Sequence, residues 1–173
     1  MLKTLGIIFT TASWWACVLS AMYLSPTPQM IILGLFVVLS IVVHLKFYVG
    51  DLKKFLRFYM IGLGAGLLAD GTLLYLGHYQ HEEFALGLFP LWLLALWLVF
   101  PLNFLHTFQK FLEKPWLCLL FGAIGGPLAY KAGPAFGILS LSDEALYIIA
   151  VYWAFYMFAM SLFKGKTGSI LEK

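Results

Sequence analysis

Apolar residues form six long runs along the chain, separated by short segments that are polar or rich in proline and glycine. The runs cover residues 4–24, 30–48, 55–75, 86–105, 116–133 and 145–163. Each has close to the roughly 20 apolar residues that an α-helix needs to cross the hydrocarbon core of a bilayer. The pattern predicts an all-α membrane protein, a bundle of six transmembrane helices that forms one domain over residues 1–173.

Proline and glycine predict where some of these helices end. We expect Ser25-Pro26-Thr27-Pro28 to separate the first two spans, because proline removes a backbone donor and restricts the residue before it. The fifth run contains Gly125-Gly126-Pro127 and, soon afterwards, Lys131. This pattern is compatible with a short helix followed by a loop, or with a broken helix that reaches Leu141. Non-helical backbone at membrane depth has to be covered by protein or by a water-filled cavity.

Composition supports a membrane protein, because 62% of the residues are hydrophobic and only 11% are charged. A soluble domain has about half apolar and about a quarter charged residues, so soluble and disordered classes are excluded. Cys17 and Cys118 both lie inside apolar runs, which argues against a disulfide framework. The chain has no Walker loop, Rossmann fingerprint, zinc-protease motif or serine-nucleophile elbow.

Basic residues predict the orientation of the spans. If the amino terminus is inside and the chain crosses six times, all but one of the 11 lysines and arginines face the cytoplasm. These are Lys3, Lys46, Lys53, Lys54, Arg57, Lys110, Lys114, Lys164, Lys166 and Lys173. The outer loops then carry Lys131 and the acidic Glu82, Glu83, Asp143 and Glu144. The positive-inside rule therefore predicts that both termini are cytoplasmic. A net charge of only +3, clustered beside the spans, does not indicate a nucleic-acid partner.

Asp70 is the most costly residue to bury, because an ionisable group in the hydrocarbon layer costs at least ~2.5–3.5 kcal/mol. It lies well inside the third run, and Tyr130 and Lys131 lie at a similar depth in the fifth. The three residues are one candidate polar site, in which Asp70 acts as a base, a proton carrier or a ligand anchor. The alternative is a structural ion pair or hydrogen bond from Asp70 to Lys131, Tyr130 or Thr72.

A second candidate polar site combines His44, Asn103 and His106, which lie near the inner face at similar depth. Pro101 precedes the last two and is expected to kink their helix. A metal site would need His44, His106 and Cys118 as ligands, but three separate helices with no short spacing motif do not favour one. The alternatives are a different polar site, or hydrogen bonds at helix ends and to lipid headgroups. We expect no metal and no cofactor.

Small residues predict close helix packing. Gly62 and Gly66 lie on one face of the third span, and Gly122 and Gly126 do the same in the fifth. Such faces let helix backbones approach each other, so we expect spans three and five to pack together. The alternative is a ligand that approaches bare backbone.

Aromatic residues make up 18% of the chain. Tyr152 and Tyr156 share one face of the sixth span at i,i+4 spacing. They are candidates for a pocket that holds an acyl chain, with helix packing as the alternative.

Several motifs resemble a bacterial family that is known as a domain of unknown function in polytopic inner-membrane proteins. The motifs are His44-Leu45, Gly66-Leu67-Leu68-Ala69-Asp70, Pro90-Leu91-Trp92-Leu93-Leu94-Ala95-Leu96-Trp97 and Gly125-Gly126-Pro127-Leu128-Ala129-Tyr130-Lys131-Ala132-Gly133. The resemblance covers most of the chain, although the first and sixth spans are generic. It implies a location in the bacterial inner membrane and no particular catalytic residue. Members are encoded near enzymes that modify membrane fatty acids, which implies a link to lipid by association.

Three functional hypotheses follow from these observations. The first is an accessory protein that binds or helps to process membrane lipid, with Asp70, Tyr130 and Lys131 as its polar focus. The second is a membrane-embedded enzyme that modifies lipid. The third is a small transporter, suggested by the break near an intramembrane charge. Membrane lipid is the expected partner, alongside a second copy of the chain or another membrane protein.

Overall fold

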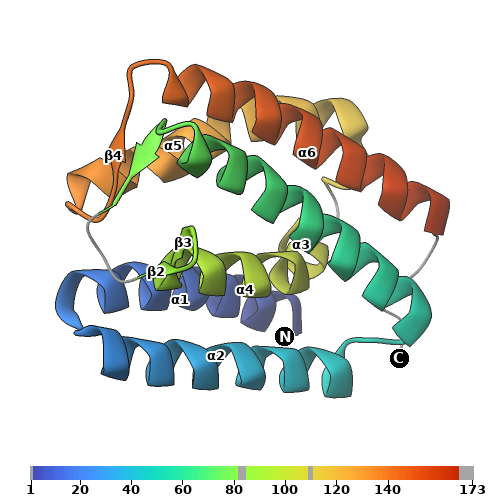
Figure 1. The fold of residues 1–173 in the computed structure, drawn as a ribbon. Coiled ribbons are helices and arrows are strands. Elements are labelled where there is room, and N and C mark those ends of the chain that lie inside the picture. Colours follow the sequence, from blue (N-terminus) through green and yellow to red (C-terminus); the bar gives the residue numbers. More distant parts are fainter. Residues whose placement is uncertain (1, 82–84, 109–110, 168–173) are drawn as a thin grey trace.

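Six helices dominate the computed structural model, which is 78% helical. It describes the backbone of residues 2–81, 85–108 and 111–167, and within these the side chains of all but 2–10, 103, 105–107 and 166–167. The helices are α1 (Leu2–Tyr23), α2 (Pro26–Phe47), α3 (Leu52–Tyr75), α4 (Leu91–Thr107), α5 (Pro115–Ala135) and α6 (Ala145–Thr167) (Figure 1). The prediction of a helical chain is confirmed.

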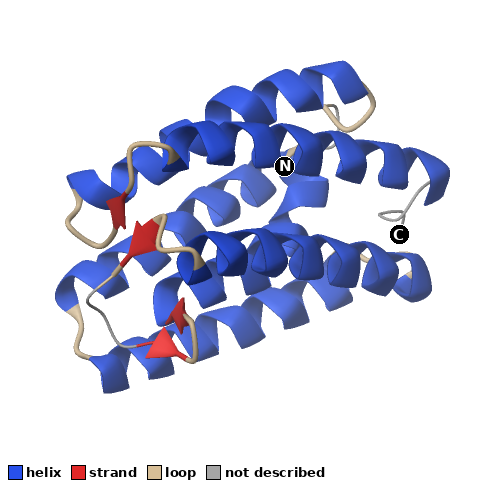
Figure 2. Cartoon of the chain, turned by 45° about the horizontal axis from the view of Figure 1, so that its top comes forward, coloured by secondary structure: helices blue, strands red, loops and turns tan. Residues whose placement is uncertain are grey.

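Successive helices run in opposite directions. As a result, α1 begins at the same end of the bundle at which α6 ends (Figure 1). Short strands gather at the opposite end, as Figure 2 shows in red. They are β1 (Tyr79–Gln80), β2 (Ala85–Leu86), β3 (Phe89–Pro90) and β4 (Ser140–Leu141). Strand β1 pairs with β4, and β2 with β3, both antiparallel. The pairing of β1 with β4 joins the loop after α3 to the loop before α6. We call the end of the bundle that carries these four strands the strand end.

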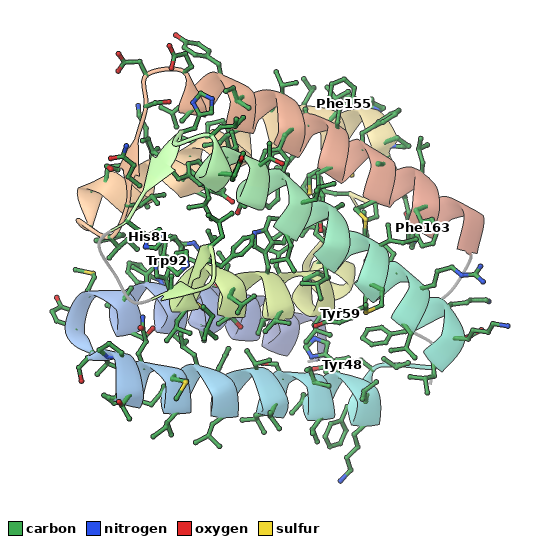
Figure 3. All side chains as sticks on the ribbon, viewed as in Figure 1. Tyr48, Tyr59, His81, Trp92, Phe155 and Phe163 are labelled. Atoms are coloured by element: carbon green, nitrogen blue, oxygen red, sulfur yellow. The ribbon has the colours of Figure 1, made fainter. Side chains whose placement is uncertain are left out.

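Two groups of helices make up the bundle. Helix α4 packs against α1, α2 and α3, whereas α5 packs chiefly against α6. Helix α3 contacts both α4 and α6 and therefore bridges the groups. Apolar side chains also cover the outside of the bundle, and Figure 3 shows Phe155 on the outer side of α6. Large apolar residues exposed on α2 include Leu35, Val38 and Leu39.

Three helices are long and apolar enough to cross a membrane, by length and composition, within the part of the chain that the structure describes. They are Pro26–Phe47, Leu52–Tyr75 and Ala145–Gly165. An exterior of this kind is costly in water and is normal in lipid. The chain therefore has the helices of a membrane protein.

Helix α2 begins earlier than the sequence pattern predicts. Pro26 and Pro28 lie in its first turn, where backbone N–H groups have no partner within the helix in any case. Helix α3 also begins early, at Leu52, because the carboxylate of Asp51 accepts a hydrogen bond from the backbone N–H of Lys54 at 3.0 Å. This bond holds the pKa of Asp51 below its ordinary value.

Helix α5 is continuous through Gly125-Gly126-Pro127 and ends at Ala135. Both alternatives for the fifth span, a short helix followed by a loop and a broken helix that reaches Leu141, are therefore wrong. Pro127 removes one backbone hydrogen bond, and a transmembrane helix tolerates this loss when neighbouring groups adjust. The chain leaves the helix after Ala135, turns at Gly137 with φ of +69°, and reaches Leu141 as strand β4.

The glycine faces pack closely, but not against each other as the sequence suggested. A side chain on Gly66 would meet the indole of Trp97 from α4, and one on Gly126 would meet the indole of Trp153 from α6. The two indoles stack with their centroids 5.7 Å apart. Two aromatic rings therefore lie between the glycines that were expected to touch, and the predicted packing of these glycine faces against each other is wrong.

The other two glycines also contact helices different from the predicted ones. A Cβ on Gly62 would meet Met160 and Tyr156 of α6, and one on Gly122 would lie 2.2 Å from the backbone oxygen of Trp153. Glycine at these positions lets α6 approach both α3 and α5.

We expect Gly66→Ala to destabilise the bundle by about 1–3 kcal/mol, because its Cβ would lie 2.1 Å from a ring carbon of Trp97. Gly64→Ala is the matched control on the same helix, since nothing lies within 4 Å of its Cβ. Alanine there gains up to about 1 kcal/mol of helix propensity. Unfolding free energies of the two variants in detergent test this, and equal values would contradict the proposed contact.

Candidate functional site

Asp70 has an exposed fraction of 0% and lies on the inward face of α3. The residue is within about two helical turns of the strand end. No cation forms an ion pair with Asp70 among the described residues, where the ion pairs are Lys54–Asp51 and Lys164–Glu113. A buried carboxylate without a counter-ion needs hydrogen bonds to replace its hydration.

Four donors surround the carboxylate, two on each oxygen. Oδ2 accepts hydrogen bonds from Nε1 of Trp97 at 2.7 Å and from the hydroxyl of Tyr130 at 2.5 Å. Oδ1 accepts from the hydroxyls of Tyr79 and Tyr152, both at 3.2 Å. An ionised carboxylate has about four lone-pair positions, so this donor set saturates it. We call Asp70 and its four donors the aspartate cluster.

Each donor of the aspartate cluster comes from a different element. Trp97 lies on α4, Tyr130 on α5, Tyr152 on α6 and Tyr79 on β1. The three helical donors lie within about two turns of the strand end, at the depth of Asp70. One side chain of α3 thus contacts every other helix of the bundle except α1 and α2.

Tyr79 shows how the strand end contributes to the cluster. The pairing of β1 with β4 places Tyr79 beneath the loops, where its ring stacks on Tyr130 at 5.4 Å. Burial, and then the nearby Tyr130 and Asp70, raise the pKa of Tyr79 above its ordinary value. Its hydroxyl therefore keeps its proton and remains a donor to the carboxylate.

The structure brings together only part of the first predicted site. Tyr130 contacts Asp70, as expected. Lys131 follows Tyr130 directly, and adjacent positions of a helix point about 100° apart, so Lys131 is exposed on the outside of the bundle. It forms no ion pair among the described residues. Thr72 is also exposed, and its hydroxyl donates to the backbone oxygen of Leu68 at 2.7 Å. Of the three alternative partners of Asp70, Tyr130 is confirmed, whereas the contacts with Lys131 and Thr72 are wrong.

Sequence reasoning missed three of the four donors. It treated Tyr152 as a pocket or packing residue, and it assigned no contact with Asp70 to Trp97 or Tyr79. Depth was an available signal for Trp97 and Tyr152, because each lies about as far from the outer loops as Asp70 does. A second signal is spacing, because Gly66 precedes Asp70 by one helical turn and leaves room for the Trp97 ring.

An apolar cavity of about 90 Å³ adjoins the aspartate cluster. Trp97 and Tyr130 form part of its wall, so two of the Asp70 donors are shared with it. The rest of the wall comes from α1, α4, α5, α6 and the loop after α5, through Trp14, Val18, Trp92, Leu93, Leu96, Phe100, Ala129, Gly133, Ile138, Leu139 and Trp153. The cavity lies between the two groups of helices, near the strand end. We call it the aromatic cavity.

A second hollow, a groove of about 370 Å³, lies between α3 and α6. Tyr152 lines this groove, and His78 closes it toward the strand end through a hydrogen bond of 2.9 Å to Ser142. Asp70 itself lines neither hollow, since its donors separate it from both. The carboxylate is thus an internal anchor, and the surfaces available to a ligand are aromatic and aliphatic.

The second predicted site is described only in part. His44 is buried on α2, with its Nδ1 2.7 Å from the backbone oxygen of Ser40 and its ring 5.5 Å from that of Tyr48. The side chains of Asn103 and His106 lie outside the described residues. The structure therefore does not test this group, which stays a prediction.

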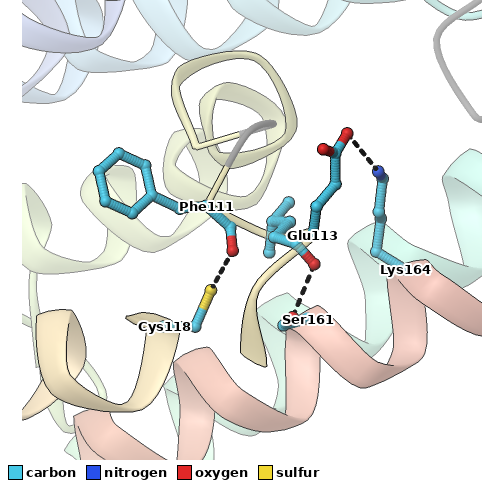
Figure 4. Close-up of polar contacts among 6 residues, drawn as sticks. Phe111, Glu113, Cys118, Ser161 and Lys164 are labelled. Atoms are coloured by element: carbon cyan, nitrogen blue, oxygen red, sulfur yellow. Dashed lines mark hydrogen bonds and ion pairs between the residues drawn. The ribbon is translucent and has the colours of Figure 1, made fainter. Parts of the chain in front are cut away.

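Cys118, the third ligand of the metal alternative, contacts the connector between α4 and α5. Its thiol donates to the backbone oxygen of Phe111 at 3.0 Å, and Ser161 of α6 donates to that of Leu112 at 2.7 Å (Figure 4). The connector is therefore tied to α5 and α6. Within the described part of the chain, no three His, Cys, Asp or Glu side chains lie close enough to hold a metal ion.

We expect Tyr130→Phe to destabilise the protein by about 1.5–3 kcal/mol, because it removes a hydrogen bond to a buried carboxylate and keeps the ring. Tyr156→Phe is the matched control. Its hydroxyl donates to a neutral group, the backbone oxygen of Gly62, at 3.3 Å, so its loss costs about 1 kcal/mol or less. Unfolding in detergent measures both, and a larger loss for Tyr156→Phe would contradict the anchoring role of Asp70.

Comparison with known proteins places the chain in a family. Residues 4–159 match a family described as "Protein of unknown function (DUF2878)". No curated protein and no solved structure gives a significant match. The family match extends from α1 into α6 and includes every residue of the aspartate cluster. Because the match covers well over half of its length, the chain belongs to this family of proteins of unknown function.

Proposed function

We propose that the chain is a six-span protein of the bacterial inner membrane that binds membrane lipid as an accessory factor, with the end of an acyl chain in the aromatic cavity. The single observation that carries the proposal is that cavity, an apolar hollow with aromatic walls inside a bundle whose exterior is also apolar. Such a lining suits the end of an acyl chain, because an acyl chain needs no polar partner along its length. At about 90 Å³ the cavity is smaller than the roughly 150 Å³ cavity that holds benzene, so it takes only the end of the chain.

The six-span arrangement is supported by the antiparallel course of the helices. Lys46, Lys53, Lys54, Arg57, Lys114 and Lys164 all belong to the end opposite the strands. Asp143 and Glu144 belong to the strand end. The side chains of Lys3 and Lys166, and the residues Lys110, Lys173, Glu82 and Glu83, lie outside the described part. The distribution supports a cytoplasmic location for the end opposite the strands and for both termini.

No comparable observation favours the two alternative functions. The break that suggested a transporter is replaced by a continuous helix α5. The carboxylate that suggested an enzyme has its lone pairs occupied by four donors and lines neither hollow. Assembly with a second copy or with another membrane protein stays a prediction.

Orientation is tested by single-cysteine labelling in intact cells. Gln80→Cys, at an exposed position of β1, is expected to react with a membrane-impermeant maleimide from outside. Lys53→Cys, at the start of α3, is expected to react only after the cytoplasmic membrane has been permeabilised. The native Cys17 and Cys118 are both 0% exposed, so the wild-type protein gives the background. The reverse pattern of labelling would contradict the proposed topology.

Lipid binding is tested by blocking the aromatic cavity. Ala129→Trp places a large ring at an exposed position of its wall, and we expect about a tenfold or greater loss of co-purifying lipid, which corresponds to about 1.4 kcal/mol or more of lost binding. Leu128→Trp is the control, because Leu128 is the neighbouring residue, is 63% exposed and is not part of the wall. Native mass spectrometry after mild detergent extraction measures the bound lipid. Equal lipid content in the two variants would contradict binding in the cavity.

A further inference from the structure

The groove between α3 and α6 is open to the surroundings of the bundle, and the proposed function does not use it. Its volume is about 370 Å³. Helix α3 and its C-cap contribute side chains from Ala65 to Leu76, and α6 contributes Ile148 and Tyr152. Leu68, in its wall, is 73% exposed, so the groove faces outward rather than into the bundle. We call it the α3–α6 groove.

Two contacts between α3 and α6 define the ends of this groove. At one end, the hydroxyl of Tyr156 donates to the backbone oxygen of Gly62 at 3.3 Å. At the other, just beyond the helices, Nδ1 of His78 lies 2.9 Å from the hydroxyl of Ser142. Between these contacts the wall includes Ala69, whose side chain is too small to fill the space between the helices. The hollow is therefore a built feature of the bundle.

The length of the α3–α6 groove matches one leaflet of a bilayer. From Ala65, near the middle of α3, to Leu76, at its C-cap, the chain rises about 16 Å at 1.5 Å per residue. The hydrocarbon core of a bilayer is about 30 Å thick, so one leaflet is about 15 Å. The mostly apolar wall thus covers the depth of an acyl chain in the leaflet at the strand end, and the groove ends where headgroups begin.

Polar and charged groups lie at the strand end of the groove. Nδ1 of His78 is engaged with Ser142, so Nε2 is the ring nitrogen that remains for a ligand. Glu144 lies one helical turn before Ile148, whose backbone N–H donates to the backbone oxygen of Glu144 at 3.2 Å. Asp143 and Glu144 are both exposed, and neither forms an ion pair among the described residues. This end of the groove therefore has negative charge without a counter-ion.

This charge discriminates between classes of lipid headgroup. Opposite charges attract and like charges repel, so a headgroup with a cationic amine is favoured over an anionic one. Lys131 is also near the strand end, but it lies on α5, which contributes no side chain to the groove. When Ser142 donates to Nδ1 of His78, Nε2 carries the ring proton and can donate to a phosphate oxygen. A zwitterionic headgroup, with an amine and a phosphate, suits both groups.

We propose that the α3–α6 groove binds a phospholipid with an amine-bearing headgroup, such as phosphatidylethanolamine. One acyl chain lies along the groove, and the ammonium group lies beside Glu144. This inference goes beyond the proposed function, because it concerns a different hollow and the head of the lipid rather than the end of a chain. It shares with that function only the location in a membrane.

The headgroup is tested with two lipids that have the same acyl chains, dioleoyl phosphatidylethanolamine and dioleoyl phosphatidylglycerol. Only the first has an ammonium group. With equal amounts of both in detergent, we expect the purified protein to bind the first with a preference of about threefold or more, measured by native mass spectrometry. Glu144→Gln should remove most of this preference. Glu113→Gln is the matched control and should keep it, because Glu113 lies in the connector between α4 and α5, at the opposite end of the bundle.

The place of binding is tested by filling the groove. Ala65→Trp puts a large ring at an exposed position of the wall, and we expect about a fivefold or greater loss of bound phosphatidylethanolamine. Met60→Trp is the control, because Met60 is 60% exposed on the same helix and is not part of the wall. Ala129→Trp, which blocks the aromatic cavity, should keep the preference for the amine headgroup.

The outcomes separate this inference from the proposed function. Equal binding of the two lipids by the wild-type protein, or a preference that survives in both Glu144→Gln and Ala65→Trp, would overturn the inference and leave binding in the aromatic cavity in place. Full lipid binding in Ala129→Trp, with a loss in Ala65→Trp, would support the inference and contradict the cavity. A wild-type dimer that becomes a monomer in Ala65→Trp, with bound lipid unchanged, would assign the groove to a second copy of the chain and overturn the inference.

Discussion

The arrangement of the helices depends on the hydrogen bonds to the carboxylate of Asp70. Lipid tails are as apolar as the side chains that face them, so the hydrophobic effect does not drive helices together inside a bilayer. Close packing and polar contacts take its place. The four hydrogen bonds to Asp70 join α3 to α4, α5, α6 and β1, and therefore connect the two groups of helices at one depth.

The same cluster shapes the aromatic cavity. Trp97 and Tyr130 point their polar atoms toward Asp70, while their rings form part of the cavity wall. The position of that wall is thus set by hydrogen bonds rather than by apolar packing alone. Residues that stabilise the bundle and residues that would contact a lipid are, in these two cases, the same residues.

Glycine spacing makes this arrangement possible. Gly66 lies one turn before Asp70, and Gly126 lies one turn before Tyr130. Each glycine provides the space for an indole, that of Trp97 over Gly66 and that of Trp153 over Gly126. The stacked indoles lie between these glycines of α3 and α5, which explains why the small residues do not bring the two helix backbones together.

Local properties of the chain could be read from the sequence alone. They include the six apolar helical runs, the basic character of one end and the cost of burying Asp70, because each depends only on residue type and position along a helix. The partners of Asp70 were decided by tertiary structure, since Tyr79, Trp97 and Tyr152 reach it from separate elements. In a soluble helix an apolar stripe reveals the inward face, but these helices are apolar on nearly every side. Their rotation, and with it the identity of the groups that meet, is set only when the side chains pack.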